Sequence, residues 1–228
     1  MLKPAAFVKP TGAKPPVNRL VTKSRHFRGN WSCNCAKTPM DLIIPALLAV
    51  LLSETGGKTQ MLARARALSG DLGAAMAALT LTSLAAYGFA AVGGLLIGPL
   101  LPAEAKAMLF GLSLLFAGLP LFLSPKPAPE TIAAKGIAPA AFGFVKTQFG
   151  DAAQFIVFAL AAKGSSPVLA AVGGLAGVLI AALIASGLGK DWPQGRTLLA
   201  IRWGIAILLS VIGAVMAINA MGLIHQGD

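Results

Sequence analysis

From Met40 onward, the sequence contains repeated apolar stretches of about 20 residues with at most two charged side chains each. A helix of about this length crosses the ~30 Å hydrocarbon core of a bilayer. Charged residues make up only 12% of the chain and hydrophobic residues 56%, whereas a typical soluble domain has roughly 25% charged residues. So few charges cannot cover the surface of a water-soluble globule. The pattern therefore predicts an all-α, polytopic membrane protein.

Breaks that contain proline, glycine and charged residues divide the apolar region into six expected transmembrane helices. These helices are expected over residues 42–62, 72–100, 105–123, 137–161, 167–188 and 198–222. The longest connection, a proline-rich linker over 125–136, follows the third span. We therefore expect one three-helix repeat over 41–124 and a second over 137–224.

Residues 1–40 carry eight basic side chains and no acidic one, so most of the net charge of +11 lies there. A basic, proline-containing segment can bind nucleic acid or anionic lipid, or act as a targeting segment. It also fits a disordered or non-native extension ahead of a start at Met40, which is the interpretation we favour, and we expect no nucleic-acid partner. Cys33 and Cys35 are then incidental, because His26 alone does not complete a metal site with them.

An internal repeat is suggested when the sequence is shifted by 94 residues onto itself. Residues 51–61 then lie over 145–155, and a polar cluster in the first span pairs with one in the fourth. The only identities in this window are Gly56 with Gly150 and Gln60 with Gln154. Because three spans is an odd number, the second copy must cross the membrane in the opposite direction. This predicts two inverted three-helix repeats, a plan found in many secondary transporters.

The distribution of Lys and Arg predicts the topology. The face reached after the first, third and fifth spans is more basic than the opposite one, whose loops carry only Lys106 and Lys163. The basic side chains counted on that first face are Arg64, Arg66, Lys126, Lys135, Lys190, Arg196 and Arg202. The positive-inside rule puts this face in the cytoplasm and both termini outside. We expect the protein to lie in the inner (plasma) membrane of the cell.

Four ionisable side chains are expected at membrane depth: Glu54 and Lys58 in the first span, and Lys146 and Asp151 in the fourth. Ionisable groups there are costly, so each is a functional hypothesis. Glu54 and Asp151 are the two carboxylates expected to reach the interior of the bundle. The remaining acidic side chains lie at span ends or in loops, where a solvated position is expected.

Neutral oxygens accompany the two carboxylates, including those of Gln148 and Thr59. Two carboxylates with neutral oxygens suit a hard divalent cation such as Ca²⁺ or Mn²⁺. Gly56, Gly57 and Gly150 could loosen the helices at these points and free backbone carbonyls as further ligands.

A purely structural interpretation of the same residues is also open. Glu54 and Lys58 are four residues apart in the favourable order and could neutralise each other along one helix. Lys146 could extend its ammonium group to the membrane surface or pair with an acid. The glycines could serve close helix packing, as in many membrane bundles.

At Glu54–Thr59 and again at Gln148–Ala153, the sequence resembles the small membrane family that includes the Golgi calcium/manganese–proton exchangers and bacterial manganese exporters. That family carries the motif E-x-G-D-[KR]-[ST] twice, in the first and fourth of six core spans. The resemblance covers residues 40–224. It implies two inverted three-helix repeats, exchange of a divalent cation for protons, and the motif acids as cation ligands.

Both copies of the motif depart from the family pattern. The first copy has Gly57 where the family has Asp, and the second has Gln148 where the family has Glu. Ala152 and Ala153 replace the basic and hydroxyl residues of the second copy. The four acids of the family are thereby reduced to two, which still match the charge of one divalent cation.

These observations predict a divalent cation (Mn²⁺ or Ca²⁺)/proton antiporter that exports the cation, with no resident cofactor. Glu54 and Asp151 would ligate the cation, Gln148 and Thr59 would complete its shell, and Lys58 would hold Glu54 or compensate its charge. A non-transporting membrane binding or assembly protein and an exporter of another small solute are the alternatives. A soluble enzyme is not expected, because the sequence shows no nucleophile–base pair or phosphate-binding loop. The oligomeric state stays open.

Overall fold

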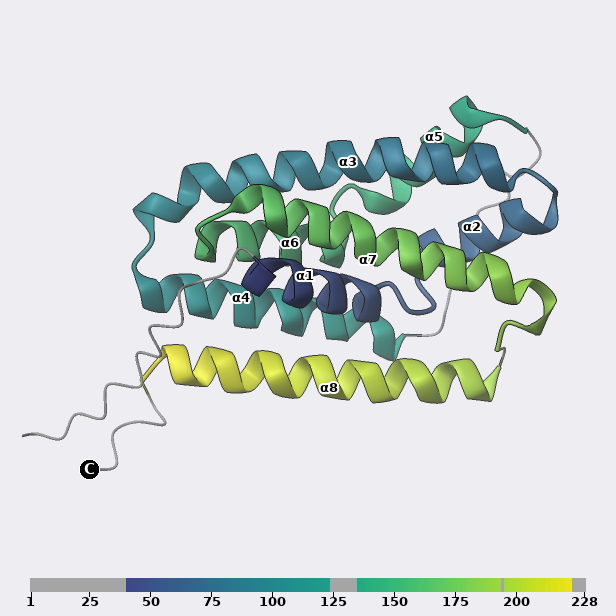
Figure 1. Ribbon diagram of the computed structural model, residues 1–228. Helices are drawn as coiled ribbons and strands as arrows, with labels where there is room; N and C mark the ends of the chain where they lie inside the picture. The colour runs from purple at the N-terminus through teal and green to yellow at the C-terminus, as the bar shows by residue number, and fades with distance from the viewer. Residues whose placement is uncertain (1–39, 124–134, 194, 223–228) are drawn as a thin grey trace, which may run out of the picture. The chain divides into compact units, whose positions relative to one another are not determined.

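The computed structural model of the chain describes residues 40–123, 135–193 and 195–222. Every regular element in these ranges is a helix (Figure 1), which confirms the predicted all-α class. The expected N-terminal extension and nearly all of the expected linker lie outside the described residues. The same holds for His26, Cys33, Cys35 and Lys126.

Two short helices followed by two longer helices occur twice along the described chain. The first group comprises α1 (Met40–Ser53), α2 (Lys58–Leu68), α3 (Leu72–Ile97) and α4 (Ala103–Gly118). The second group comprises α5 (Ile137–Gln148), α6 (Ala152–Lys163), α7 (Pro167–Leu188) and α8 (Arg196–Ala220). Short 3₁₀ turns follow three of the longer helices: η1 (Gly98–Leu100), η2 (Leu119–Phe122) and η4 (Gly189–Asp191).

Four of the described helical segments are long and apolar enough to cross a membrane, judged by length and composition. They are Leu72–Leu100, Ala103–Phe122, Pro167–Asp191 and Arg196–Ala220, in good agreement with four of the expected spans. Helices α1 and α2 count as a fifth span if they are taken together, although they meet at 73°. Helix α6 is apolar but only 12 residues long. The described chain therefore fits a multi-pass membrane protein with four or five candidate spans.

The two remaining expected spans are each interrupted by a break. The first break separates α1 from α2 at residues 54–57, and the second separates α5 from α6 at residues 149–151. Each break contains a glycine with a positive φ, +66° at Gly56 and +79° at Gly150. This left-handed conformation does not continue an α-helix and disfavours residues with a Cβ. Each stretch that was expected to be one helix is therefore two helices.

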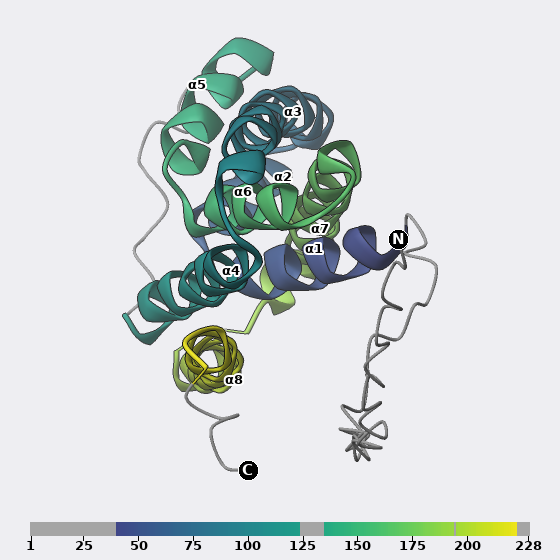
Figure 2. The same cartoon turned by 90° about the vertical axis from the view of Figure 1, so that its left-hand side faces the viewer.

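Glycines allow close backbone contact between α4 and α8, which lie side by side (Figure 2). A Cβ built on Gly111 of α4 would lie 2.8 Å from the carbonyl oxygen of Gly213 in α8. A Cβ built on Gly213 would lie 2.7 Å from the carbonyl oxygen of Gly111. Side chains larger than hydrogen would force the two helices apart, as expected where small residues mediate helix packing in a membrane.

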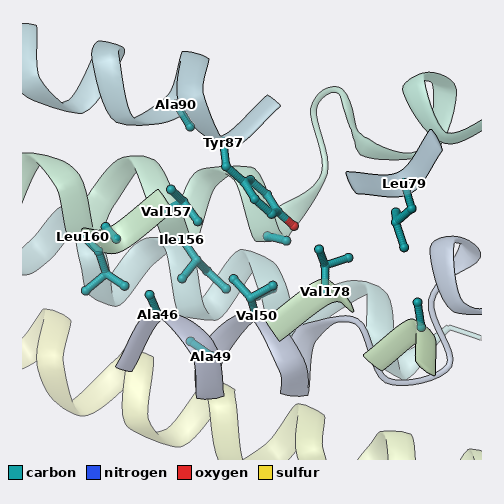
Figure 3. Close-up of a cluster of buried hydrophobic side chains, with 14 of the residues drawn as sticks. Ala46, Ala49, Val50, Leu79, Tyr87, Ala90, Ile156, Val157, Leu160 and Val178 are labelled. Atoms are coloured by element: carbon teal, nitrogen blue, oxygen red, sulfur yellow. The ribbon is translucent and has the colours of Figure 1, made fainter. Parts of the chain in front are cut away.

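The buried core is built largely from alanine and branched aliphatic side chains. Figure 3 shows Tyr87 reaching from α3 into this cluster, near Val157 of α6 and Val178 of α7. Large apolar side chains are also exposed on the outer faces, such as Phe89 with 71% and Leu96 with 68% of its surface exposed. Many exposed large apolar side chains of this kind fit helices that face hydrocarbon rather than water.

A polar network joins the turn between α2 and α3 to the beginning of α5. Arg66 is buried and forms an ion pair of 2.9 Å with Asp71, whose Oδ2 also accepts a hydrogen bond of 3.1 Å from the backbone N–H of Gly136. Both findings correct the sequence analysis, which assigned Arg66 to the loop charges and Asp71 to a solvated position. The Gly136 hydrogen bond, together with the positive charges of Arg66 and Lys135, holds the pKa of Asp71 below its ordinary value.

Asp71→Asn is expected to lower the melting temperature at neutral pH and to have little effect near pH 3. Because the pKa of Asp71 is lowered on folding, its stabilising effect is complete above the unfolded value of about 4 and is lost as the pH falls through the lower folded value. Melting temperatures of parent and variant in detergent between pH 7 and pH 3 measure this. A constant difference over the whole range would contradict the role of the Asp71 charge.

Candidate functional site

A cavity of about 260 Å³ lies between the two helix breaks. Its lining includes Glu54 from the first break and Asp151 from the second, so the fold brings both predicted carboxylates to one space. Lys58 and Arg202 also line the cavity. The remaining lining residues are Ser53, Gly56, Gly57, Ala117, Pro120, Leu121, Leu123, Thr147 and Ala152.

The two carboxyl groups are close enough to share a hydrogen bond. Glu54 is only 2% exposed, and its Oε1 has no hydrogen-bond partner within the described part of the chain. Thr59 is buried on α2 and hydrogen-bonds the Glu54 side chain. Two carboxylates at this distance repel each other unless a proton or a cation lies between them. The pair can therefore hold a proton or bind a cation.

Local backbone structure explains why Asp151 faces this cavity. Asp151 is the N-cap of α6 with an extended backbone; its side chain makes no cap hydrogen bond, although the backbone N–H of Ala152 acts electrostatically on its carboxylate. The first N–H groups of a helix have no partner inside the helix, so a negative charge is favourable at this position. Gly57 is the corresponding N-cap of α2 and has no side chain to offer. The first break therefore contributes its carboxylate from Glu54.

Gln148 lies near this region but is held by a different helix. It is 2% exposed, and its Nε2 donates a hydrogen bond of 2.5 Å to Ser83 Oγ of α3. Its Oε1, the atom that could ligate a cation, is buried without a partner among the described residues. Gln148 and Thr59 do not line the cavity itself, although Thr59 contacts Glu54.

The two lysines predicted at membrane depth differ in position. Lys58 is exposed, lines the cavity and acts electrostatically on Asp151. It forms no ion pair with Glu54 within 4.0 Å, so the intrahelical pair considered from the sequence is not formed. Lys146 is exposed, and its Nζ lies 4.3 Å from the centre of the Phe142 ring, away from the cavity lining.

Arg202 is the main site residue that the sequence analysis missed. It was counted as a loop charge, but it is 5% exposed in α8 and lines the cavity. Its guanidinium donates hydrogen bonds to the carbonyl oxygen of Gly56 in the first break, and to those of Pro120 and Leu123 at 3.1 Å each. It thereby ties the first break to η2 and to Leu123, which follow α4. The only available signal was its position as the fifth residue of the expected span 198–222.

The topology prediction changes with this finding. With Arg66 and Arg202 buried, five of the seven counted cations are left as loop charges. The opposite loops carry two. The bias that favours a cytoplasmic location for the first face is therefore weaker than the sequence suggested.

Tyr87 is a second residue that the sequence analysis did not single out. It is 2% exposed, and its hydroxyl has no hydrogen-bond partner within the described chain. The charges of Glu54 and Asp151 act on this hydroxyl. As the only tyrosine of the chain, within an otherwise apolar span, it could have been recognised as a polar group at depth.

A second, mainly apolar cavity of about 560 Å³ adjoins the first at Asp151. It lies between α4 and the second break, and Phe116, Phe155 and Phe158 contribute to its lining. Asp151, Ala152 and Pro120 line both cavities. The Asp151 carboxylate therefore stands between a polar and an apolar space.

The described residues contain no group of three or more His, Cys, Asp or Glu side chains that could hold a metal ion. A cation bound at the carboxyl pair would thus need backbone carbonyl, amide, hydroxyl or water oxygens as its other ligands, which Ca²⁺ and Mn²⁺ accept. Comparison of the chain with protein-family models, curated proteins and solved structures found no significant match.

Proposed function

We propose that the chain is a secondary transporter that exchanges a divalent cation, Mn²⁺ or Ca²⁺, for protons and exports the cation across the plasma membrane. The observation that carries this proposal is the contact between Glu54 and Asp151, which come from two separate helix breaks and face one cavity. Broken helices are the elements from which many transporters build their binding sites. The family resemblance at the two breaks points to the same activity.

The proposed architecture is six spans in two inverted three-helix repeats, with α1–α2 and α5–α6 as broken spans. A shift of 94 residues supports this architecture, because it carries the first residue of α2, Lys58, onto the first residue of α6, Ala152. The same shift pairs the two positive-φ glycines, Gly56 and Gly150. It also aligns α3 with α7 and α4 with α8 to within a few residues at their starts.

The charge of the two carboxylates determines how many protons can be exchanged for one cation. A divalent cation neutralises deprotonated Glu54 and Asp151, and two protons neutralise the same pair once the cation has left. Ligation requires deprotonated carboxylates, so protons and cation compete for the same oxygens. Two carboxyls exchange at most two protons for each divalent cation. Lys58 and Arg202 add positive charge to the cavity, which weakens cation binding relative to a site with four acids.

A second function is favoured by one observation, the presence of both charge signs in the cavity lining. Glu54 and Asp151 supply negative charge, and Lys58 and the Arg202 guanidinium supply positive charge. Such a lining suits a small zwitterionic solute, whose ammonium and carboxylate groups would pair with lining side chains of opposite charge. This candidate is an exporter of another small solute on the same fold.

Thermal stability of the purified full chain, with Mn²⁺, Ca²⁺, Mg²⁺ or a small zwitterion added at pH 8 and pH 6, tests the proposal. A ligand at about 100 times its Kd stabilises the folded state by ~2.7 kcal/mol. For a chain of this size, this raises the melting temperature by about 5–10 °C. We expect Mn²⁺ or Ca²⁺ to do so, more weakly at pH 6, because protons compete.

Glu54→Gln and Asp151→Asn should each abolish the cation-induced rise in melting temperature. Glu104→Gln is the matched control: it lies at the exposed start of α4 and should retain that rise. Stabilisation by the zwitterion alone would favour the second function. No stabilisation by any ligand at millimolar concentration would favour a non-transporting membrane protein.

A further inference from the structure

The glutamine that follows the first break joins the break to a helix of the other half of the chain. Gln60 Oε1 accepts a hydrogen bond of 2.7 Å from the backbone N–H of Gly56. Gln60 Nε2 donates a hydrogen bond of 2.9 Å to the carbonyl oxygen of Ala181 in α7. We call this pair of hydrogen bonds the Gln60 bridge.

The glutamine after the second break makes the corresponding contacts. Gln154 Oε1 accepts a hydrogen bond of 2.9 Å from the N–H of Gly150, and Gln154 Nε2 donates one of 3.3 Å to the carbonyl oxygen of Ala86 in α3. We call this the Gln154 bridge. The two glycines and two glutamines concerned are the only identities between residues 51–61 and 145–155.

The two bridges cross between the halves of the chain. Gln60 on α2 reaches the long helix α7, and Gln154 on α6 reaches the long helix α3. An amide side chain suits this role because its oxygen accepts from the break N–H while its separate NH₂ group donates to the opposite carbonyl. Because unpaired backbone groups are costly at membrane depth, each bridge fixes the break to the opposite half.

The bridges differ in tightness. Gln60 is 4% exposed and Gly56 is buried, whereas Gln154 is half-buried and Gly150 is exposed. The cross-half hydrogen bond is also longer at Gln154, 3.3 Å against 2.9 Å at Gln60. The two bridges thus have the same pattern of hydrogen bonds, but the residues of the Gln60 bridge are buried and those of the Gln154 bridge are partly exposed.

We propose that Gln60 and Gln154 are paired positioning residues: each bridge holds its break against the long helix of the other half, and release of a bridge opens the cavity beside that break. The Gln154 bridge is the one that opens more readily. The significance for transport rests on the proposed function, but the mechanical role of the bridges does not.

Cysteine accessibility at two matched positions of the cavity lining tests this proposal. Ser53 and Thr147 line the cavity from opposite breaks, and each hydroxyl bonds only a carbonyl of its own helix among the described residues. Single reporters, Ser53→Cys or Thr147→Cys, are made in the full chain with Cys33→Ser and Cys35→Ser. The rate of labelling by a membrane-impermeant thiol reagent is then measured on the protein in vesicles.

Gln→Glu separates the two hydrogen bonds of a bridge, because a carboxylate still accepts from the break N–H but cannot donate to the opposite carbonyl. Gln154→Glu is expected to speed labelling of Thr147→Cys about tenfold, the change that ~1.4 kcal/mol makes in an equilibrium. Labelling of Ser53→Cys should stay within about twofold of the parent. Gln60→Glu should produce the converse pattern. Gln60→Met and Gln154→Met, which remove both hydrogen bonds, should act at least as strongly.

Thr82→Val is the control, because Thr82 is buried in α3 and its hydroxyl bonds only carbonyls of its own helix among the described residues. It should change neither labelling rate. The proposal is overturned if both reporters respond equally to each glutamine variant, as in general loosening, or if neither responds. A selective response without any metal-dependent stabilisation would leave the bridges established and remove the antiporter. Metal-dependent stabilisation without a selective labelling response would support the antiporter and overturn the proposed role of the bridges.

Discussion

Alanine at Glu54 or at Asp151 is expected to abolish the protection of cells against excess manganese. Each substitution removes one of the two carboxylates that face the shared cavity. A single remaining carboxylate cannot neutralise a divalent cation, and a buried unpaired charge is costly. The measurement is growth of cells in a manganese series, with the amount of each variant in the membrane determined in parallel.

Glu104→Ala is the control for this experiment, because Glu104 is an exposed carboxylate at the start of α4 and lies outside the cavity. It should protect cells as well as the parent. Normal protection by both Glu54→Ala and Asp151→Ala at parental expression would refute the cation-exchange mechanism. Loss with one substitution alone would leave a single functional carboxylate and would exclude two-proton exchange at this pair.

Arg202→Met is expected to destabilise the protein by about 2–4 kcal/mol, because three carbonyls lose their donor, at ~1–3 kcal/mol each where buried as at Gly56, and water compensates those of the exposed residues Pro120 and Leu123. The guanidinium donates to carbonyls of the first break and of the segment that follows α4. This loss corresponds to a melting temperature lower by about 5–15 °C. Thermal unfolding of parent and variant in the same detergent measures it.

Two further variants separate the charge of Arg202 from its geometry. Arg202→Lys keeps the positive charge, but an ammonium group on a flexible stem does not reproduce the planar set of five donors, so only part of the stability should return. Arg196→Met, at the exposed start of the same helix, should lie within about 0.5 kcal/mol of the parent. Equal stability of Arg202→Met and the parent would show that the carbonyls find other donors.

The proposed cation exchange and the two glutamine bridges involve the same two helix breaks but give them different roles. Glu54 and Asp151 would carry the chemistry, whereas Gln60 and Gln154 would control whether the breaks stay closed around it. The first pair differs in residue type and position between the halves, and the second pair is identical in both. A chain that forms the same glycine–glutamine contact at both breaks, while its two carboxylates differ in type and position, is organised around the breaks themselves.

Sequence patterns predicted the helical membrane class and four spans to within a few residues, because the length of an apolar run is a local property. They also identified Glu54 and Asp151 as interior carboxylates, since a charge within such a run is rare enough to stand out. The fold, not the pattern, decided that the first and fourth runs are broken helices. The residues on both sides of each break are apolar, so composition does not show where the helix ends. Glycine can adopt either a negative or a positive φ, and only the folded structure shows that Gly56 and Gly150 have a positive one.

The contacts of Arg202, Gln148 and Gln154 could not be predicted from the sequence either. Arg202 meets Gly56 across 146 residues of chain, Gln148 meets Ser83 across 65, and Gln154 meets Ala86 across 68. The sequence by itself identified Glu54 and Asp151 as carboxylates within apolar runs. Only the tertiary structure decided that they share one cavity, because helix packing, and not periodicity, brings residues so far apart in the chain within hydrogen-bonding distance.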